Sequence, residues 1–566
     1  MLTNKDVARK LKTTAALIEL TGGNEYRARA LSNAARTVER LDEAVADLAA
    51  EGRLEELRGI GSGLSVQIQD LLDKGTFDLY DDLVSALPPG LTEMLRVKGL
   101  GAKKVRTIWR TLGITTIEEL EEVATIGRLA DLDGFGEKTQ ENVLANIQLL
   151  KKYSSRRRFD QALAEATRAL EWIRNLDEVV RADVSGPLRR QFETVDRADF
   201  VVGTESVEAV CERLHERWNT ARTEAGDAAR LDGQIANGMP ARIDIVRPDR
   251  FTLHWWRETG STDHVAYVEK TFDLPSLPSE EAAIYKAAGM PFIAAALRED
   301  VGEFEAAAAD ELPNLLTVED LRGTIHNHSR YSDGAHSLRE MSDAARSMGF
   351  SYYGACDHSR SLAIAGGLSI ERVREQQEEI RLLNEAYGDD FRVFSGTESD
   401  ILADGSLDYP DDVLASFDLV VASIHTRFNM SADEATVRII RAVENPYTTI
   451  LGHPTGRLLL QREGYPVHHE RVIDACAAHR VAIELNANPR RLDLDWRWIR
   501  RATDRGVLIS INPDAHSIDE LHYMKWGVSV AQKGWLTPEQ CLNAKSLSDF
   551  TAWLESRRSQ QGVGQV

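Results

Sequence analysis

Side chains suited to metal chemistry are concentrated in the last part of the chain, where histidines and acidic residues follow short apolar runs. Nine of them stand out: His326, His328, Asp333, His358, Glu398, His425, His453, Asp514 and His516. A mixture of imidazole and carboxylate ligands suits zinc, manganese or iron, whereas magnesium and calcium prefer oxygen ligands alone. Because these side chains are too many for a single ion, the pattern predicts a site for two or three divalent metal ions.

Such a site points to one class of reaction. A bound divalent ion lowers the pKa of water toward neutrality, and a second ion neutralises phosphate oxygens and the leaving alkoxide. The pattern therefore predicts phosphoester hydrolysis. A single histidine is more often a structural residue, and we interpret five of the others as structural: His254, His264, His468, His469 and His479.

The spacing of the ligands indicates the elements that must hold them. His326 and His328 are two residues apart, as are Asp514 and His516. Because side chains alternate along a strand, we expect each pair to share a face and converge on a metal. From about residue 320 onward, short β-rich runs alternate with helical patterns, which is the order of a β/α barrel or a layered α/β domain.

The segments ahead of this region differ in texture. Residues 5–150 are predicted to form short amphipathic helices, since apolar residues such as Val7 and Leu11 recur at three- and four-residue spacing. The basic run at 151–158 marks the change to a mixed α+β domain, with strand-like runs at 200–202 and 243–246.

A glycine pattern recurs three times within the helical region. It reads Gly59-Ile60-Gly61, Gly99-Leu100-Gly101 and Gly134-Phe135-Gly136, and Lys103, Lys104 and Lys138 follow two of the copies. Glycines let backbone N–H groups approach a phosphate closely, and the helix that follows presents its positive N-terminus to the same anion. We therefore predict three helix-hairpin-helix units that bind DNA through these residues. The alternative is that the glycines mark tight turns between helices.

Composition limits the partners and the compartment. The 566-residue chain has a formal charge of −22, which argues against non-specific coating of nucleic acid, so any DNA contact must be local. We expect a cytoplasmic protein without a membrane partner, because the sequence has no long apolar run and no apolar stretch behind its N-terminal charges. The four scattered cysteines fit a reducing compartment. Nothing in the sequence identifies a protein partner.

The motifs around the nine residues resemble those of the PHP (polymerase and histidinol phosphatase) family. They are His326-Asn327-His328-Ser329, Ser332-Asp333-Gly334, Cys356-Asp357-His358-Ser359, Gly396-Thr397-Glu398, Ala422-Ser423-Ile424-His425, Leu451-Gly452-His453-Pro454 and Asn512-Pro513-Asp514-Ala515-His516. The resemblance covers about residues 320–560 and implies a distorted (β/α)7 barrel with a trinuclear site. It assigns His326, His328, Glu398 and Asp514 to one ion, Glu398, His425 and His453 to a second, and Asp333, His358 and His516 to a third.

We predict catalytic roles for Glu398, Asp514 and Arg427. Arg360, Arg427 and Arg457 each follow a ligand motif closely. Arginine binds phosphate oxygens through paired N–H groups, so these three are candidates for holding the substrate. The alternative is that they are ordinary surface arginines.

The order of three hairpins, a mixed domain and a PHP-like segment resembles bacterial and archaeal family X DNA polymerases over essentially the whole chain. Matching stretches lie at residues 25–30, 186–190 and 259–261. The resemblance implies an all-α N-terminal region, an α+β nucleotidyltransferase-like palm with a shortened thumb, and the PHP barrel. The expected domains are 1–80 with the first hairpin, 81–152 as a fingers-like region with the other two, 153–318 as palm and thumb, and 319–566 as the PHP phosphoesterase.

The polymerase motifs of that family are incompletely matched. Pro187 stands where the family has a serine that meets the incoming triphosphate, and Arg197 stands at the first acid of the metal-binding Asp-x-Asp pair. The residual polymerase site is predicted to consist of Arg189, Arg190, Asp199 and Asp244. Because a cation replaces a required carboxylate, we expect little or no polymerase activity.

These features together predict a metal-dependent DNA phosphoesterase that works as a 3′–5′ exonuclease in DNA repair and holds DNA by its backbone. Variants of this prediction are abasic-site cleavage and 3′-end cleaning. The competing hypotheses are an active repair polymerase with an associated exonuclease, a small-molecule phosphatase and a non-catalytic DNA-binding scaffold. Arg197 argues against the first of these, the hairpins against the second and the intact ligand set against the third.

Overall fold

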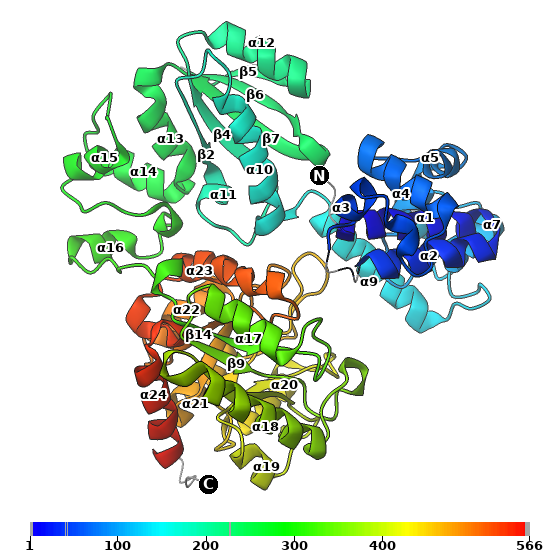
Figure 1. Ribbon diagram of the computed structural model, residues 1–566. Helices are drawn as coiled ribbons and strands as arrows, with labels where there is room; N and C mark the ends of the chain where they lie inside the picture. Colours follow the sequence, from blue (N-terminus) through cyan, green and yellow to red (C-terminus); the bar gives the residue numbers. More distant parts are fainter. Residues whose placement is uncertain (1–3, 40, 42, 226–227, 561–566) are drawn as a thin grey trace. The chain divides into compact units, whose positions relative to one another are not determined.

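The computed structural model describes residues 4–39, 41, 43–225 and 228–560 (Figure 1). The chain separates into two compact units after Ser154, and each is described by itself. None of the described helices is both long and apolar enough to cross a membrane.

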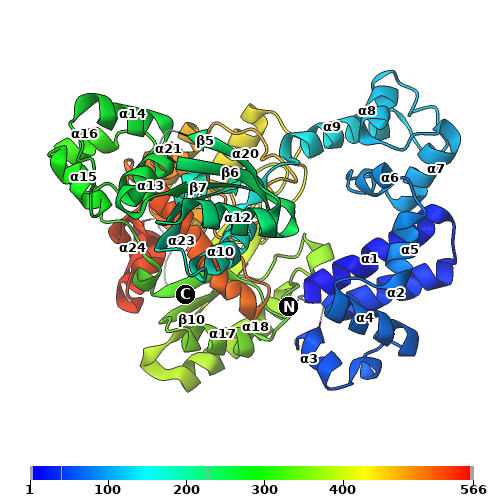
Figure 2. The same ribbon diagram turned by 90° about the horizontal axis from the view of Figure 1, so that it is seen from above.

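All regular elements in the described part of the first unit are helices, as predicted from the spacing of apolar residues. The α-helices are α1 (Asn4–Thr21), α2 (Glu25–Glu39), α3 (Val45–Ala50), α4 (Ser62–Lys74), α5 (Asp78–Ser85), α6 (Pro89–Met94), α7 (Ala102–Leu112), α8 (Ile117–Thr125) and α9 (Glu137–Tyr153). One apolar core joins α1, α2 and α4 around Ile68, and another joins α7, α8 and α9 around Val105. Figure 2 shows these two groups side by side, with α1 to α4 in one and α6 to α8 in the other.

The second unit begins with a five-stranded mixed sheet. Its first part contains β1 (Arg157–Arg158), α10 (Phe159–Arg174), β2 (Arg181–Ser185), α11 (Gly186–Arg189), β3 (Thr194–Val195), β4 (Ala198–Gly203), α12 (Val207–Trp218), β5 (Ala221–Ala225), β6 (Ala228–Ile235) and β7 (Met239–Val246). The strand order is β2-β4-β7-β6-β5, in which only β4 and β7 are parallel. Helices α10 and α12 contribute to the apolar core that the sheet covers.

Four further helices follow the sheet and build a smaller core around Trp256. They are α13 (Phe251–Thr259), α14 (Thr262–Thr271), α15 (Glu281–Ala287) and α16 (Glu303–Ala308). Within this core, His264 lies 2.8 Å from Glu303 and 2.9 Å from the Tyr285 hydroxyl and is fully buried. These contacts are those of a structural histidine. We call β1–β7 with α10–α16 the sheet domain.

The rest of the second unit is a parallel, nearly closed barrel. Its strands are β8 (Gly323–Asn327), β9 (Tyr352–Ala355), β10 (Arg392–Asp400), β11 (Leu419–Ser423), β12 (Ile450–Leu451), β13 (Ala482–Asn486) and β14 (Ile509–Asn512). They follow one another in chain order, every neighbouring pair is parallel, and a bridge between Asn327 and Ala515 joins the ends of the first and last strands.

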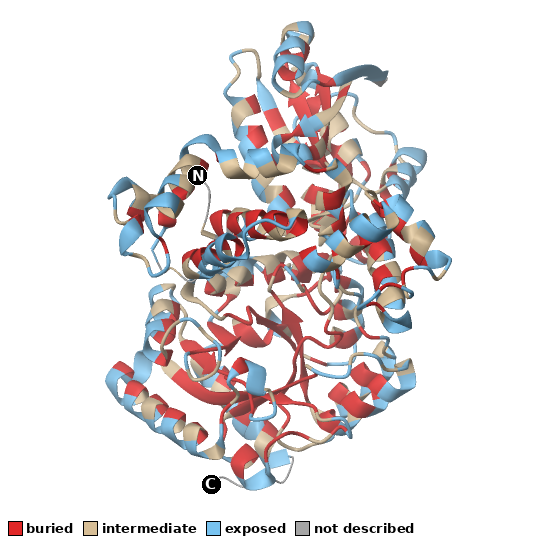
Figure 3. Ribbon diagram, turned by 90° about the vertical axis from the view of Figure 1, so that its right-hand side faces the viewer, coloured by how far each residue is buried: buried red, intermediate tan, exposed pale blue. Residues whose placement is uncertain are grey.

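Helices cover the outside of the barrel, so its strands are buried on both faces (Figure 3). The helices are α17 (Leu338–Ser347), α18 (Ile370–Tyr387), α19 (Asp411–Ala415), α20 (Ala432–Val443), α21 (His469–His479), α22 (Trp496–Thr503), α23 (Met524–Lys533) and α24 (Leu547–Gln560). Burial on both faces explains why the strands read as apolar runs rather than as alternating patterns. Because all the strands are parallel, their carboxyl ends meet at one end of the barrel, which we call the mouth.

The sheet domain and the barrel pack directly on each other. Phe192 meets Trp496 edge to face at a ring distance of 6.4 Å, and Phe159 meets Trp526 in the same way at 5.7 Å. Beside them, the Arg457 guanidinium of the barrel donates to Glu193 of the sheet domain at 2.6 Å, with both side chains largely buried. The two parts therefore share apolar packing and a buried ion pair.

Replacing Arg457 by methionine should destabilise this contact strongly, because it leaves the Glu193 carboxylate buried without a cation. Loss of one partner of a buried pair costs about 3–5 kcal/mol. Urea unfolding followed by tryptophan fluorescence measures the effect, and Arg497→Met is the matched control, since Arg497 pairs with Asp495 in the same cluster but is largely exposed. Equal unfolding midpoints for the two variants would contradict the prediction.

Candidate metal centre

The nine predicted ligands gather at the mouth of the barrel, although they come from widely separated positions in the sequence. His326 and His328 come from the end of β8, His358 follows β9, Glu398 lies in β10, His425 follows β11, His453 follows β12, and Asp514 and His516 follow β14. Asp333 comes from the loop after β8. Each side chain thus reaches the mouth from the carboxyl end of a strand or from the loop behind it.

Glu398 lies at the middle of the group. Its Oε1 atom is 2.9 Å from His453 Nε2, 3.1 Å from His425 Nε2 and 3.3 Å from His326 Nε2. Its Oε2 atom is 2.9 Å from His358 Nδ1 and 3.6 Å from His328 Nε2. One carboxylate therefore touches five imidazoles, which is the arrangement of a bridging ligand.

The other two acids complete the group. Asp514 Oδ1 lies 3.2 Å from His328 Nε2, and Asp333 Oδ1 lies 3.3 Å from His516 Nε2 and 3.6 Å from His358 Nε2. Ligand atoms converge closely in three sets: His328, Asp333, His358 and His516; His326, His328 and Asp514; and His358, Glu398 and His425. The sets share members and differ in detail from the three assigned by the PHP resemblance, in which His453 joins His425.

Several of these side chains have buried atoms that hydrogen bonding leaves unsatisfied. Among the described residues, His326 Nε2, His328 Nδ1, His358 Nδ1, His453 Nδ1 and Glu398 Oε2 are buried without a hydrogen-bond partner. Leaving a buried polar atom unpaired costs about 1–3 kcal/mol. So many in one place fit a site whose partners are metal ions, and the donor set of imidazole and carboxylate suits zinc, manganese or iron.

The electrostatics of the centre are those of a cation site. Burial alone would raise the pKa of Glu398, but the imidazoles of His425 and His326 hold that pKa well below its ordinary value. Conversely, against the effect of burial, Glu398 and Asp400 raise the pKa of His425 to about 10, and Asp333 raises that of His516 to about 9. Glu398 therefore keeps its charge, and these two imidazoles bind protons more tightly than an ordinary histidine does. Metal ions would replace those protons, since ligating imidazole is neutral.

The HxH pair does not reach the site by simple strand alternation. β8 has a register irregularity between Thr324 and Asn327, and His326 has a left-handed φ of 59°. His453 and Asp514 also have positive φ, at 21° and 52°. Such backbone is uncommon for residues with side chains and concentrates at functional sites. The expectation that regular alternation aims both histidines is therefore wrong, although both point to the mouth.

An outer layer of buried polar side chains surrounds the ligands, and sequence reasoning missed it. Asp400 accepts a hydrogen bond from His425 Nδ1, and Glu484 contacts His326 Nδ1 at 2.6 Å. Asn486 and Asn512 donate to the same Glu484 carboxylate at 2.9 and 2.8 Å. The available signal was Glu484 itself, a lone acid within the apolar run of β13.

The three arginines that follow ligand motifs differ in their contacts and in their exposure to solvent. Arg457 is held by Glu193 and by the carbonyl groups of Arg491 and Leu492, so its guanidinium is not directed to a substrate. Arg360 is half-exposed and donates to the Asp408 carbonyl at 2.7 Å. Arg427 is exposed and lines a groove of about 540 Å³.

Arg491 is an arginine that sequence reasoning missed. Its Nε atom lies 3.6 Å from Asp514 Oδ2, and its side chain is only 20% exposed. The Arg491 guanidinium thus forms an ion pair with Asp514, one of the candidate metal ligands.

The three glycine hairpins of the first unit share one geometry. In each, the first glycine has a positive φ (Gly59 86°, Gly99 92°, Gly134 79°), and the second glycine immediately precedes α4, α7 or α9. The residue between them is buried, whereas a Cβ on any of the six glycines would meet nothing within 4 Å. The apolar residue anchors each turn, and the glycines leave the helix N-terminus open to a ligand.

Comparison with known proteins agrees with these features. Residues 2–77 match a model of a helix-hairpin-helix domain, and residues 91–148 match a SAM-like helix-hairpin-helix tandem. The chain is 35% identical to the DNA polymerase/3′-5′ exonuclease PolX of Bacillus subtilis, over 97% of this chain and 99% of that protein. The chain belongs to the PolX family. The predicted resemblance to family X polymerases with a PHP domain is confirmed.

Two more distant relatives match a smaller part of the chain. Probable phosphatases of Caldanaerobacter subterraneus and Caldicellulosiruptor bescii are each 28% identical over 31% and 29% of this chain, and over 69% and 68% of their own lengths. Relatives of the PolX chain thus include both a polymerase/exonuclease and proteins named for phosphatase activity.

The two acids of the predicted residual polymerase site are each paired with an arginine. Arg197 Nε donates to Asp199 at 2.6 Å, and Arg230 holds both Asp244 oxygens at 2.6 Å. His254 also contacts Asp244, at 2.9 Å. Burial raises the pKa of Asp199 although Arg197 opposes it, whereas Arg230 and His254 overcome burial and lower the pKa of Asp244. Both carboxylates are thus paired with guanidinium groups of the chain itself.

The two arginines of the predicted residual polymerase site, Arg189 and Arg190, are also engaged within the protein. Arg189 forms two hydrogen bonds with Glu281, at 2.8 and 2.6 Å, and stacks on Trp255. Arg190 is buried and donates to Glu299 at 2.7 Å. Their charges are balanced by side chains from the segment after the sheet, which leaves them poorly placed to meet a triphosphate.

Replacing Asp199 by asparagine should leave DNA hydrolysis unchanged, because Arg197 already neutralises this carboxylate and the ligands at the barrel mouth are untouched. Neither the parent chain nor the variant should extend a primer. Extension is measured with Mg²⁺ or Mn²⁺ in a Glu398→Ala background, so that degradation does not mask synthesis. Template-directed extension that Asp199→Asn abolishes would refute the prediction and restore an active polymerase.

Proposed function

We propose that this chain is a metal-dependent DNA phosphoesterase that removes nucleotides from DNA 3′ ends, as a 3′–5′ exonuclease in DNA repair. The convergence of nine imidazole and carboxylate side chains at the barrel mouth, with buried atoms left without hydrogen bonds, carries this proposal. The relative in Bacillus subtilis, whose name includes 3′-5′ exonuclease, supports the same polarity.

Two or three divalent ions, with manganese, zinc and iron as candidates, would be held by the nine ligands. When bound, such ions supply a nucleophilic hydroxide near neutral pH and neutralise charge on the phosphate. Glu398 would bridge neighbouring positions, because its two oxygens face different imidazoles. Asp514 would bind metal through Oδ1, because its Oδ2 accepts a hydrogen bond from the Asn486 amide at 3.1 Å.

The arginines at the mouth would bind rather than react. A guanidinium stays protonated at any physiological pH and cannot serve as a general base. Arg427, exposed on the loop after His425, would contact a phosphate oxygen or the DNA strand. Arg491 would balance the charge of Asp514. Arg457 has no such role, because its guanidinium is occupied by Glu193 and backbone carbonyls.

DNA affinity would come from the first unit. The hairpins at Gly59–Gly61, Gly99–Gly101 and Gly134–Gly136 present backbone N–H groups to phosphates, which positions DNA without reading its bases. Lys103 and Lys138 are exposed in the first turns of α7 and α9, close to this anion-binding geometry. In this proposal residues 1–80 and 81–152 bind DNA, 153–318 is a palm and thumb without synthesis, and 319–566 performs hydrolysis.

A small-molecule phosphatase is the second candidate, and the similarity to probable phosphatases favours it. Fold and metals alone do not fix the substrate. The DNA-binding hairpins weigh against it, because a small phosphoester has no use for three phosphate-backbone contacts.

DNA carrying a label at one end tests the proposal directly. With a metal-loaded full chain, a 5′-labelled strand should shorten progressively, while a 3′-labelled strand should release labelled mononucleotide at once. His326→Ala should lower the rate by more than about 100-fold, since losing a ligand exceeds the 10–100-fold effect typical of an outer partner. His468→Ala, at an exposed histidine, is the control. Early mononucleotide release from the 5′ label, or a single internal cut, would contradict the proposed polarity.

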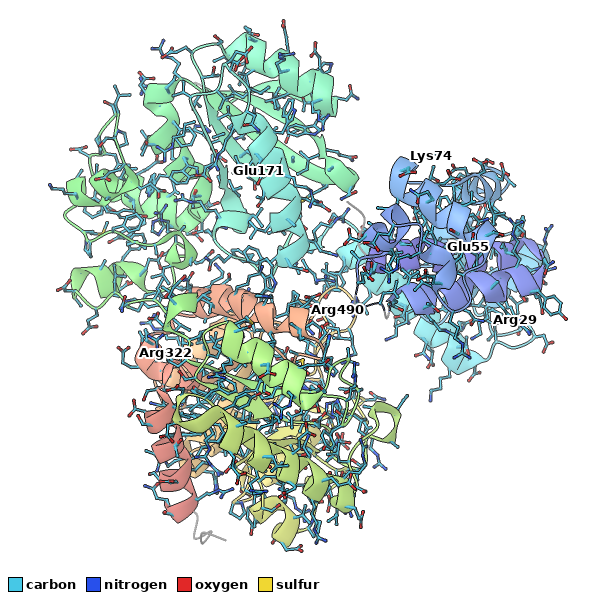
Figure 4. All side chains as sticks on the ribbon, viewed as in Figure 1. Arg29, Glu55, Lys74, Glu171, Arg322 and Arg490 are labelled. Carbon is cyan, nitrogen blue, oxygen red and sulfur yellow. The ribbon has the colours of Figure 1, made fainter. Side chains whose placement is uncertain are left out.

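Charge reversal at the hairpins separates DNA binding from chemistry. Lys103→Glu, Lys104→Glu and Lys138→Glu together should weaken DNA binding and reduce its salt dependence by about one unit of log–log slope for each phosphate that is no longer neutralised. Hydrolysis of a small chromogenic phosphodiester should be unchanged. Lys74→Glu, at the far end of α4 (Figure 4), is the control. Unchanged degradation of DNA by the triple variant would favour the phosphatase candidate.

A further inference from the structure

We infer that Glu484 is a positioning residue that aims three ligands of the proposed metal centre from β13, the barrel strand that carries none of the nine ligands itself. This inference rests on the proposed function, because it assigns a task within the same site. Glu484 and Asn486 are two residues apart on one strand, so their side chains share the face that looks into the barrel. Both are fully buried.

The Glu484 carboxylate receives four hydrogen bonds. Its Oε2 atom is 2.6 Å from His326 Nδ1 and accepts from Asn512 at 2.8 Å. Its Oε1 atom accepts from the backbone N–H of His453 at 3.0 Å and from Asn486 at 2.9 Å. Two of these contacts reach ligand residues directly, one on a ring nitrogen and one on the backbone.

The contact with His326 fixes the tautomer of that ring. A carboxylate that already accepts from two amides and a backbone N–H requires its fourth partner, His326 Nδ1, to carry a proton. The lone pair is then on Nε2, the buried atom without a hydrogen-bond partner that lies 3.3 Å from Glu398. An outer carboxylate of this kind orients a ligating imidazole and raises its basicity.

The contact with Asn486 extends the same control to a third ligand. The Asn486 amide donates one hydrogen to Glu484 and the other to Asp514 Oδ2 at 3.1 Å. Asp514 is thereby held with Oδ1 directed at His328, at 3.2 Å. Through one carboxylate and one amide, β13 orients ligands that come from the ends of β8, β12 and β14.

Only a carboxylate satisfies this arrangement. A glutamine at position 484 has nearly the same shape, but either orientation of its amide would place an NH2 group against two N–H donors. The substitution therefore breaks two hydrogen bonds on one side and leaves buried donors unpaired, while the space remains filled. Glu484→Gln tests charge and acceptor number without opening a cavity.

Asp400 offers a matched comparison. Asp400 accepts a hydrogen bond from His425 Nδ1, as Glu484 does from His326 Nδ1. Among the described residues, Asp400 is hydrogen-bonded to no other ligand ring. Asp400→Asn should therefore weaken the binding of one ion, whereas Glu484→Gln should weaken every ion that uses His326, His453 or Asp514. The set of Asp333, His358 and His516 contacts neither carboxylate and serves as an internal reference.

The test is metal binding by the full chain, with Zn²⁺ and Mn²⁺ titrated separately into chelator-stripped protein against a chromophoric competitor. For Glu484→Gln we expect about 10–100-fold weaker binding of more than one equivalent, and for Asp400→Asn weaker binding of one equivalent only. Relative to the parent chain, the thermal unfolding midpoint of Glu484→Gln should fall less when a chelator is present than when metal is present. Asn486→Ala, which leaves the buried carboxylate in place, should weaken the ions held by Asp514.

The outcomes separate this inference from the proposed function. A parent chain that binds no divalent ion would overturn the proposed function. A parent that binds metal, with Glu484→Gln matching it in affinity and stoichiometry, would overturn the inference alone. Equal loss of the thermal midpoint with and without metal would also overturn it, because Glu484 would then support the barrel and not the ligands. If Glu484→Gln does not fold, wild-type metal binding by Asn486→Ala overturns it.

Discussion

The structure of the barrel mouth depends on keeping charged ligands together around a carboxylate, Glu398, that is almost wholly buried. Glu398 is 1% exposed and lies close to five imidazoles, so protein groups and not water surround its charge. Ionised groups are costly to bury unless they are paired, and among the described residues several ring nitrogens here have no hydrogen bond. Holding these groups together costs stability, which a rigid scaffold must supply. A nearly closed parallel barrel does so by fixing each strand end through its neighbours.

The second unit has two groups of buried carboxylates, and their charges are balanced in different ways. At the barrel mouth, carboxylates are left for exchangeable cations. In the sheet domain, Asp199 and Asp244 are neutralised by Arg197 and Arg230, whose cations belong to the chain. A covalently attached guanidinium cannot be lost by chelation and cannot bridge a substrate phosphate to the enzyme as a metal ion does. The sheet domain thus balances its buried carboxylates with its own side chains, and it packs on the barrel through Phe192, Trp496 and the Glu193–Arg457 pair.

Sequence reasoning succeeded where a residue's type and its neighbours in the chain carry the information. The nine candidate ligands, which the structure brings together at the barrel mouth, can be picked out because imidazoles and acids follow apolar runs, and the hairpins because GxG recurs between helices. It failed where a partner lies far away in sequence. His326 meets Glu484 across 158 residues, and Arg457 meets Glu193 across 264. No local pattern contains such a pairing, so the sequence groups Arg457 with the phosphate-binding candidates and gives Glu484 no role. The positive φ of His326 is likewise not predicted by any local pattern.

The acidity of the chain adds a constraint on how it can meet DNA. With a net charge of −22, long-range electrostatics repel the polyanion, so affinity must arise at short range. Backbone N–H groups suit this situation, because a hairpin and helix N-terminus bind phosphate through fixed dipoles that add no net charge. At the barrel mouth, bound metal ions would add positive charge to a centre that contains the carboxylates of Asp333, Glu398 and Asp514. Metal ions would then have an electrostatic role beside their chemical one, since a loaded mouth attracts the phosphodiester. Substrate access and catalytic competence would thus depend on the same ions, and a chain stripped of metal would lose the attraction for a DNA end together with the means of cleaving it.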